Sequence, residues 1–346
     1  MEDPTRLPGR RTFLKTVSAA GIAAAMGTFT ASGAPADTQS NAAPAATTRP
    51  PLAPDEFRKR IEGPIYSLPT PFTATFDVDH TGIKKSVDRA AKAGIRLFML
   101  TSGNGEYESL TYDEVKALTK TMVEATGGRG LVVAASGGWW TAQTVDYAKY
   151  AESIGADAVQ IQIPTRRGGD DSVVKHYKEV AAATKLPIVL HGDFAAPLLR
   201  KLLAEVPAVC AMKEDVTFDY YIARQIEFGD RIAIFGGGME HRLLVGMPYG
   251  SRAFYSAYSP FAPDVSMKYW EAYQSGDMKK VAALVRKYDY PYLQKFSKQF
   301  WHGSMEYFGV AQRYLRPPME SYTDAQMKEL KPFFDGQGLD PGAYAS

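Results

Sequence analysis

Short apolar runs alternate with amphipathic stretches of about ten to fifteen residues from Gly63 to about residue 264. Short apolar runs are typical of buried strands, and the stretches between them repeat apolar residues at helical spacing. The expected strands are residues 65–68, 97–100, 131–134, 158–163, 188–190, 209–212, 232–235 and 253–256. Strands that alternate with helices along a chain form a parallel sheet with helices packed on it. The pattern therefore predicts an α/β fold.

Eight strand-and-helix units in about 200 residues favour one (β/α)8 TIM barrel over an open doubly wound sheet. An open sheet stays possible, because periodicity does not show whether the first and last strands pair. After residue 264 the strand signal stops, and helices are expected at residues 267–274, 278–288, 293–308 and 325–334. These helices carry many aromatic residues, so we expect them to pack on the barrel or on another subunit. The predicted organisation is a barrel at 59–264 followed by a C-terminal helical region at 265–346.

The first fifty residues differ from the rest of the chain. Residues 9–15 read Gly-Arg-Arg-Thr-Phe-Leu-Lys, an Ala-rich run follows at 17–29, and residues 34–36 read Ala-Pro-Ala. A charged start, an apolar middle and a small-residue end are typical of a signal peptide, and the paired arginines indicate the twin-arginine route. We therefore predict a twin-arginine signal peptide at 1–36 and a disordered linker at 37–58. A disordered tail with a chance arginine pair is the alternative.

The predicted location follows from that segment: the protein is exported, to the periplasm or the outside of the cell. The apolar run is too short and too rich in alanine for a stable membrane anchor. The net charge is +2 and no basic block stands out, so no nucleic-acid partner is expected. A single cysteine excludes an intramolecular disulfide, and the five histidines lack the spacing of a zinc site.

Lys213 is the first candidate for chemistry, because it follows the apolar run Val-Cys-Ala-Met at 209–212. In a (β/α)8 barrel the reacting groups lie at the carboxyl ends of the strands. Apolar surroundings disfavour the charged form of a lysine and so favour the neutral amine, which is the nucleophile that forms a Schiff base. The alternative is a structural ion pair with Glu214 or Asp215.

Two Gly-rich turns follow expected strands. The turn at 101–106 reads Thr-Ser-Gly-Asn-Gly-Glu, and its small residues would let backbone N–H groups converge on an anion such as a carboxylate. The turn at 236–238 is three glycines, which we interpret first as a tight turn and second as an anion site.

Taken together, these segments resemble the dihydrodipicolinate synthase / N-acetylneuraminate lyase family. The resemblance covers roughly residues 60–335, and its motifs occur in the family's order. They are Thr-Pro-Phe at 70–72, Ser-Gly-Asn-Gly-Glu at 102–106, Ser-Leu-Thr at 109–111 with Glu114, Gly-Ala-Asp-Ala at 155–158 leading to Pro164, the Lys213 strand, residues 250–264 and Leu-Arg-Pro-Pro-Met at 315–319.

The resemblance implies a barrel with a C-terminal helical extension, no metal or other cofactor, and a homo-oligomer, either a dimer or a tetramer. It implies that Lys213 condenses with pyruvate or another 2-oxo acid. The turn after the second strand binds the substrate carboxylate in the family, which assigns that role to Gly103 and Asn104. Tyr255 takes the eighth-strand position that faces the bound keto acid.

Two departures from the family pattern matter. Family members usually carry a pair of hydroxyl residues where this chain has Gly-Asn at 103–104. The family's proton-relaying tyrosine aligns with Arg166, and a guanidinium stays protonated but can clamp a carboxylate. We therefore interpret Arg166 as a substrate-anion binder, with a solvated loop residue as the alternative. Arg167 is the second candidate for the anion-binding role. His191 ends the fifth strand and is the candidate for moving protons, with a structural histidine as the alternative. His241 is expected at the surface or in packing.

Two functions follow. The first is an aldolase- or dehydratase-type lyase, in which a Lys213 imine with a 2-oxo acid serves as the electron sink. The second is an exported protein that binds 2-oxo acids or sugar acids on an aldolase scaffold that has lost catalysis, which the missing tyrosine and the export signal both favour. The first is preferred, because an apolar barrel mouth is a costly place to keep a lysine.

Overall fold

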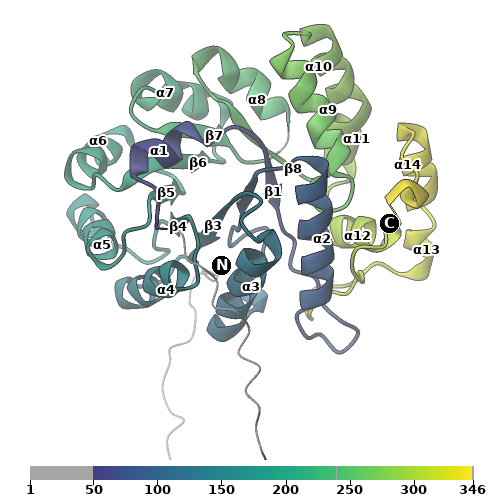
Figure 1. Ribbon diagram of the computed structural model, residues 1–346, viewed down its shortest axis with the longest axis horizontal. Helices are drawn as coiled ribbons and strands as arrows, with labels where there is room; N and C mark the ends of the chain where they lie inside the picture. Colours follow the sequence, from purple (N-terminus) through teal and green to yellow (C-terminus); the bar gives the residue numbers. More distant parts are fainter. Residues whose placement is uncertain (1–49, 239, 345–346) are drawn as a thin grey trace, which may run out of the picture. The chain divides into compact units, whose positions relative to one another are not determined.

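The computed structural model describes residues 50–238 and 240–344. Its strands are β1 (Gly63–Ser67), β2 (Leu97–Met99), β3 (Leu131–Ala135), β4 (Ala158–Gln162), β5 (Ile188–His191), β6 (Val209–Glu214), β7 (Ala233–Gly236) and β8 (Ala253–Ser256). Each pairs in parallel with the next, and β1 also pairs with β8, where Ile65 is in register with Tyr255. The sheet is thus a closed barrel (Figure 1), so the (β/α)8 prediction is confirmed and the open sheet is excluded.

Helices surround the barrel (Figure 1). They are α2 (His80–Ala93), α3 (Tyr112–Thr126), α4 (Thr141–Ser153), α5 (Asp170–Ala183), α6 (Ala196–Glu205), α7 (Phe218–Phe228) and the short α8 (His241–Gly246). Local sequence sets their ends. The Asp79 carboxylate accepts a 2.9 Å hydrogen bond from the Gly82 N–H at the start of α2, and Gly94, with φ 109°, ends that helix.

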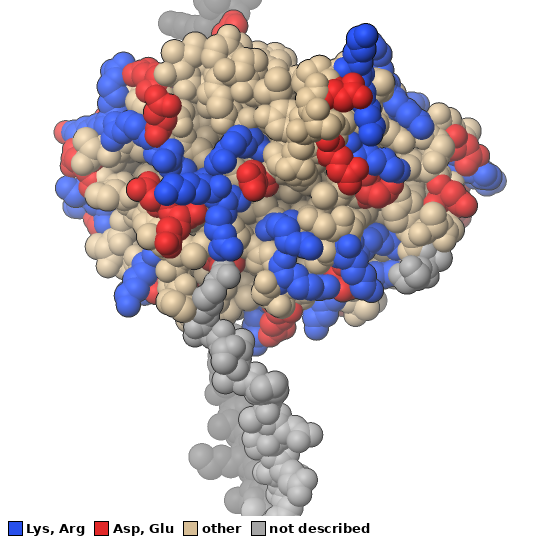
Figure 2. Space-filling view, turned by 45° about the horizontal axis from the view of Figure 1, so that its top comes forward, with Lys and Arg blue, Asp and Glu red and all other residues tan. Residues whose placement is uncertain are grey.

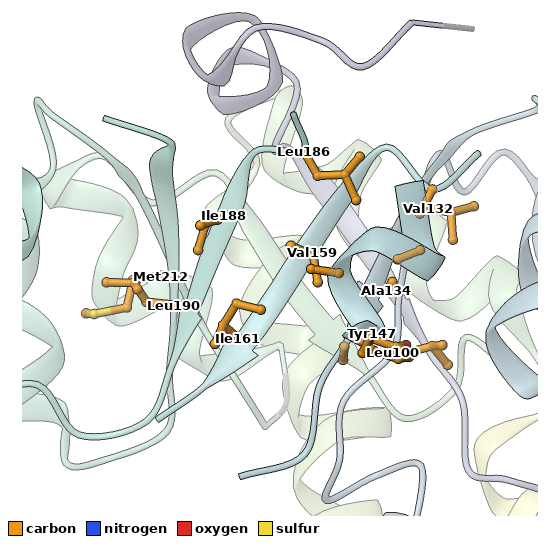
Figure 3. Packing of buried hydrophobic residues seen from close by; sticks show 14 of the residues in the cluster. Leu100, Val132, Ala134, Tyr147, Val159, Ile161, Leu186, Ile188, Leu190 and Met212 are labelled. Carbon is orange, nitrogen blue, oxygen red and sulfur yellow. The ribbon is translucent and has the colours of Figure 1, made fainter. Parts of the chain in front are cut away.

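Two apolar layers hold the barrel together. Because successive strand residues point to opposite faces, one set of side chains fills the barrel interior and the other meets the helices. Figure 3 shows the outer set, in which Val159, Ile161 and Leu190 pack side by side against the helical layer. The inner set includes Leu97, Val133 and Ala211 and is apolar to the level where the strands end.

The C-terminal region is helical, as predicted. It contains α9 (Pro263–Gln274), α10 (Met278–Leu284), the π-helix η3 (Val285–Asp289), α11 (Tyr290–Lys295), α12 (Lys298–Tyr307), α13 (Asp324–Met327) and α14 (Leu330–Gln337). In Figure 1 these helices lie on the side of the barrel where α2 and β8 are found. Tyr258 and Phe261, just after β8, share an apolar cluster with Tyr292, Phe308 and Phe334. The aromatic residues therefore form a core between the barrel and its extension.

One boundary prediction needs correction. Residues Pro54–Lys59 form helix α1, and the Phe57 side chain is fully buried among residues of the barrel interior. The predicted linker at 37–58 therefore ends in folded structure, because Phe57 has an apolar site to fill. The predicted signal peptide at 1–36 and residues 37–49 lie outside the described residues.

The surface carries both signs of charge. On the face shown in Figure 2, basic and acidic side chains are interspersed among uncharged ones, which agrees with the small net charge of +2. Among the described residues no helix combines the length and the apolar character needed to cross a membrane.

Candidate active site

The inner face of the barrel turns polar where the strands end. On β6 the residue two positions before Lys213 is Ala211, part of the apolar interior, so the period of two places Lys213 on the same inner face. The same alternation places His191 beyond Val189 on β5. Polar residues at inward positions of this kind are Ser67, Gln160, Gln162, His191, Lys213 and Tyr255. They converge on the carboxyl end of the barrel, where active sites of this fold lie.

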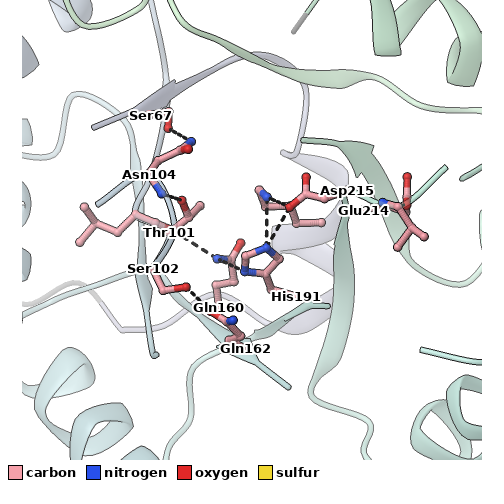
Figure 4. A network of polar contacts seen from close by, with 12 residues as sticks. Ser67, Thr101, Ser102, Asn104, Gln160, Gln162, His191, Glu214 and Asp215 are labelled. Atoms are coloured by element: carbon pink, nitrogen blue, oxygen red, sulfur yellow. Dashed lines mark hydrogen bonds and ion pairs between the residues drawn. The ribbon is translucent and has the colours of Figure 1, made fainter. Parts of the chain in front are cut away.

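Lys213 is 5% exposed and lies at the centre of this group. Its Nζ contacts Asp215 Oδ2 as an ion pair and lies 3.1 Å from His191 Nε2. The Tyr255 ring centroid is 5.2 Å from Nζ, so the ring forms one wall of the lysine site. His191 Nε2 is in turn 3.0 Å from Asp215 Oδ2 (Figure 4). The amine, imidazole and carboxylate thus form a closed triangle, in which Asp215 is the ion-pair partner considered for Lys213 from the sequence.

The three groups set each other's charge. Burial lowers the pKa of His191, and the nearby Lys213 charge lowers it further. Burial raises the pKa of Asp215, but the Lys213 charge and the His191 hydrogen bond outweigh burial and hold that pKa below its ordinary range. Near neutral pH, His191 is therefore an uncharged imidazole beside an ionised carboxylate. Its Nε2 donates to Asp215 in one tautomer and can accept a proton from Lys213 in the other.

The glycine turn after β7 passes directly over this triangle. The Gly237 N–H donates to the Glu214 carbonyl at 2.8 Å, so the turn is tied to the end of β6. A Cβ on Gly237 would lie 1.5 Å from Asp215 Oδ1 and 2.8 Å from Lys213 Nζ. Position 237 therefore requires glycine, because the side chains of Lys213 and Asp215 approach its backbone closely.

We expect Gly237→Ala to lower turnover by about 10²-fold, because Asp215 must move away from Lys213 and His191. Steady-state kinetics on the purified variant measures this. Gly336→Ala on α14 is the matched control, since a Cβ there meets nothing within 4 Å and should leave turnover unchanged. Full activity in Gly237→Ala would show that the close approach has no role.

Two N–H groups of the turn after β2 bond within the turn: Asn104 N donates to Thr101 Oγ1 at 3.2 Å, and Gly105 N donates to the Thr101 carbonyl at 2.8 Å. The Asn104 backbone therefore does not point a free N–H group at an anion. Its side chain lines the cavity instead and donates to Ser67 Oγ at 2.7 Å (Figure 4). Gly103 is exposed, and its carbonyl accepts a 2.6 Å hydrogen bond from Lys298 Nζ. Carboxylate binding by Gly103 and Asn104 stays a prediction.

Arg166 lies in the loop after β4 and is exposed. It is not among the residues that line the cavity at Lys213. Arg167 is also exposed and donates to the Pro164 carbonyl of its own loop at 3.2 Å. The structure thus brings neither arginine to Lys213, and carboxylate binding by Arg166 stays a prediction.

A cavity of about 400 Å³ opens onto Lys213. Its polar wall includes Ser67, Asn104 and Asp215, and its apolar wall comes from the residue after β8 and from the segment that begins at α11. The apolar lining consists of Ala257, Leu293, Phe296 and Trp301. His241, expected at the surface or in packing, lines this cavity, because α8 begins at the turn that follows β7. The site thus includes residues far from Lys213 in the sequence.

The outward side of β6 carries a second ion pair. Glu214 is fully buried, and its Oε2 accepts a 2.7 Å hydrogen bond from Arg242 Nη1. Arg242 Nη2 also donates to the Val216 carbonyl at 2.7 Å. Burial raises the pKa of Glu214, and the Arg242 charge opposes that effect. This pair fixes the β6 end and α8 to each other, and therefore the two residues beside them, Lys213 and His241.

Comparison with known proteins assigns the family. Residues 60–335 match the model of the dihydrodipicolinate synthetase family. The 4-hydroxy-tetrahydrodipicolinate synthase of Anaplasma marginale is 28% identical over 63% of this chain and 74% of its own. The protein named "Probable 5-dehydro-4-deoxyglucarate dehydratase" of Rhodococcus opacus is 26% identical over 80% and 96%.

A solved structure has the same fold. YagE of E. coli K12, described as a member of the dihydrodipicolinic acid synthase family in complex with pyruvate, superposes with a TM-score of 0.73 at 21% identity. The match covers 81% of this chain and 99% of that one. Because the family model spans most of the chain and the fold agrees, this protein belongs to the dihydrodipicolinate synthetase family.

Proposed function

We propose that this protein is an aldolase- or dehydratase-type lyase in which Lys213 forms a Schiff base with pyruvate or another 2-oxo acid. The observation that carries the proposal is the near-complete burial of Lys213 at the barrel mouth, facing a cavity large enough for a small organic acid. A buried ammonium is costly, and this one stands beside an acid–base pair. Relatives named as a synthase and a dehydratase, and a neighbour described with pyruvate, support the assignment.

The geometry supports a sequence of steps. The Lys213 ammonium passes a proton to the Asp215–His191 pair, and the neutral amine adds to the carbonyl carbon of the acid. Loss of one water then gives the iminium, and His191, at 3.1 Å from Nζ, is placed to move the protons that this step needs. The Tyr255 ring, 5.2 Å from Lys213 Nζ, forms one wall beside the imine. Ser67 and the Asn104 amide are the cavity groups proposed to hold the substrate carboxylate.

Whole-protein mass spectrometry after borohydride reduction tests the proposal. The protein is incubated with pyruvate, other 2-oxo acids and, as a negative control, lactate, which has no keto group. Reduction should add the mass of one reduced imine per chain for at least one 2-oxo acid and nothing for lactate. Reversible binding of these acids with no trapped adduct would overturn the proposal and favour the binding protein.

We also propose export through the twin-arginine route, supported by the sequence at residues 9–36 alone. Replacing the pair by Arg10→Lys/Arg11→Lys keeps the charge but removes the arginines that the route reads. Cell fractionation should then find the precursor inside the cell, whereas the control Arg6→Lys is exported and processed. Export of the double variant would contradict the proposal.

A further inference from the structure

His241 lies on the cavity wall with a partner buried behind it. Its side chain is about 30% exposed and lines the same cavity as Lys213. Asp289, in the C-terminal π-helix η3, is 2% exposed. Its Oδ2 accepts from His241 Nδ1 at 2.9 Å and from the His241 backbone N–H at 2.8 Å. With Nδ1 donating to the carboxylate, Nε2 is the ring nitrogen that keeps a lone pair.

A second buried carboxyl group completes the arrangement. Glu240 is 3% exposed, and its Oε1 accepts from Ser256 Oγ. Glu240 Oε2 and Asp289 Oδ1 are buried and have no hydrogen-bond partner among the described residues. Burial, and then the Asp289 charge, raise the pKa of Glu240 well above its ordinary value. Burial beside a second carboxyl group thus favours the protonated form of Glu240.

The other groups beside Glu240 and His241 are tyrosine hydroxyls, a phenylalanine ring and an arginine that is already paired. The Tyr269 hydroxyl donates to the Glu240 carbonyl at 2.8 Å, and Tyr258 lies nearby with a pKa raised by burial. The Phe218 ring packs edge-on against the His241 ring at 5.9 Å. Arg242, the next residue on α8, is bound to Glu214. Asp289 is thus the carboxylate that orients His241, in the way an aspartate orients the imidazole of a catalytic triad.

We propose that His241, oriented by Asp289, is a second acid–base residue of this active site and takes a proton from the carbon next to the Lys213 imine. The proposal rests on the proposed function. The C–H bond breaks, and its proton goes to Nε2. Its electron pair forms the C=C bond of an enamine, and the C=N pair moves to the Lys213 nitrogen. Asp289 stabilises the imidazolium, which returns the proton in the reverse step. His191 lies next to Lys213 Nζ and transfers the protons of that nitrogen.

Exchange of the pyruvate methyl protons in D₂O, followed by NMR, tests this step without knowledge of the natural substrate. His241→Gln should slow exchange by about 10²-fold and flatten its pH dependence, because an amide cannot titrate. Borohydride trapping of pyruvate on Lys213 should be retained. Asp289→Asn should also slow exchange, since an amide that donates to Nδ1 reverses the tautomer. His80→Gln, on the start of α2 and bonded to Thr121, is the control.

Chemical rescue separates catalysis from packing. Added imidazole should restore exchange to His241→Ala, because the vacated space opens to the cavity. Wild-type exchange in His241→Gln, or failure of imidazole to rescue, would overturn the inference while leaving the Lys213 imine standing. Loss of the trapped adduct in His241→Gln would also overturn it, since His241 acts after the imine forms. Absence of any adduct in the wild type would instead overturn the proposed function.

Discussion

Lys213→Ala should form no borohydride-trapped adduct and should lose turnover by at least about 10⁴-fold, because no other described residue offers an amine to this part of the cavity. Lys213→Arg tests whether the positive charge alone is enough for activity. A guanidinium keeps the positive charge beside Asp215 and His191 but does not form the imine. Mass spectrometry and steady-state kinetics measure both variants.

The comparison of the two variants separates chemistry from structure. If the ion pair with Asp215 were the only role of Lys213, Lys213→Arg would retain activity and Lys213→Ala would lose stability. We expect equal loss of adduct and turnover in both. Turnover in Lys213→Arg would show that the reaction does not need an amine nucleophile here.

Arg242→Met should lower the free energy of unfolding by about 3 kcal/mol near pH 7, because it leaves the fully buried Glu214 carboxylate without its countercharge. Methionine keeps much of the packing against the Phe218 ring, which lies 5.1 Å from the guanidinium carbon. Urea unfolding followed by circular dichroism measures the change. A loss below about 0.5 kcal/mol would show that solvent or another group compensates the charge.

The pKa of Glu214 decides how the stability of the protein changes with pH. Burial raises the pKa of Glu214 in the folded state, so the folded chain holds a proton there that the unfolded chain has released, and stability falls as pH rises between the two pKa values. Without Arg242 the folded pKa rises further. The loss in Arg242→Met should therefore be largest near neutral pH and shrink as pH falls below it. Arg242→Met/Glu214→Gln should recover most of the stability, which identifies the unpaired charge as the cause.

The strands were readable from the sequence for a physical reason. Parallel strands of a barrel are covered on both faces, so a strand such as residues 131–135 is a continuous apolar run. Closure was not readable, because pairing of β1 with β8 joins Gly63 and Ala253, which are distant in the chain. Helix α1 was missed because it is short, and only the buried Phe57 in a Pro-rich segment marks it.

The site was readable in part. Lys213 and His191 could be identified from the sequence because each follows an apolar run that predicts a strand. The period of two would also have identified Ser67, Gln160 and Gln162, since each occupies an inward position near a strand end. Asp289 carried no such signal, because it meets His241 across 48 residues through packing of the C-terminal helices. For Arg166, alignment gives a position in the chain, whereas the direction of a loop side chain depends on tertiary structure.

The most direct test of the account is to locate the trapped adduct. The protein is reduced with borohydride in the presence of pyruvate, digested and mapped by peptide mass spectrometry. The account predicts one reduced pyruvyl adduct, on Lys213, at a stoichiometry near one per chain. An adduct-free Lys213 peptide, or label spread over exposed lysines, would contradict it.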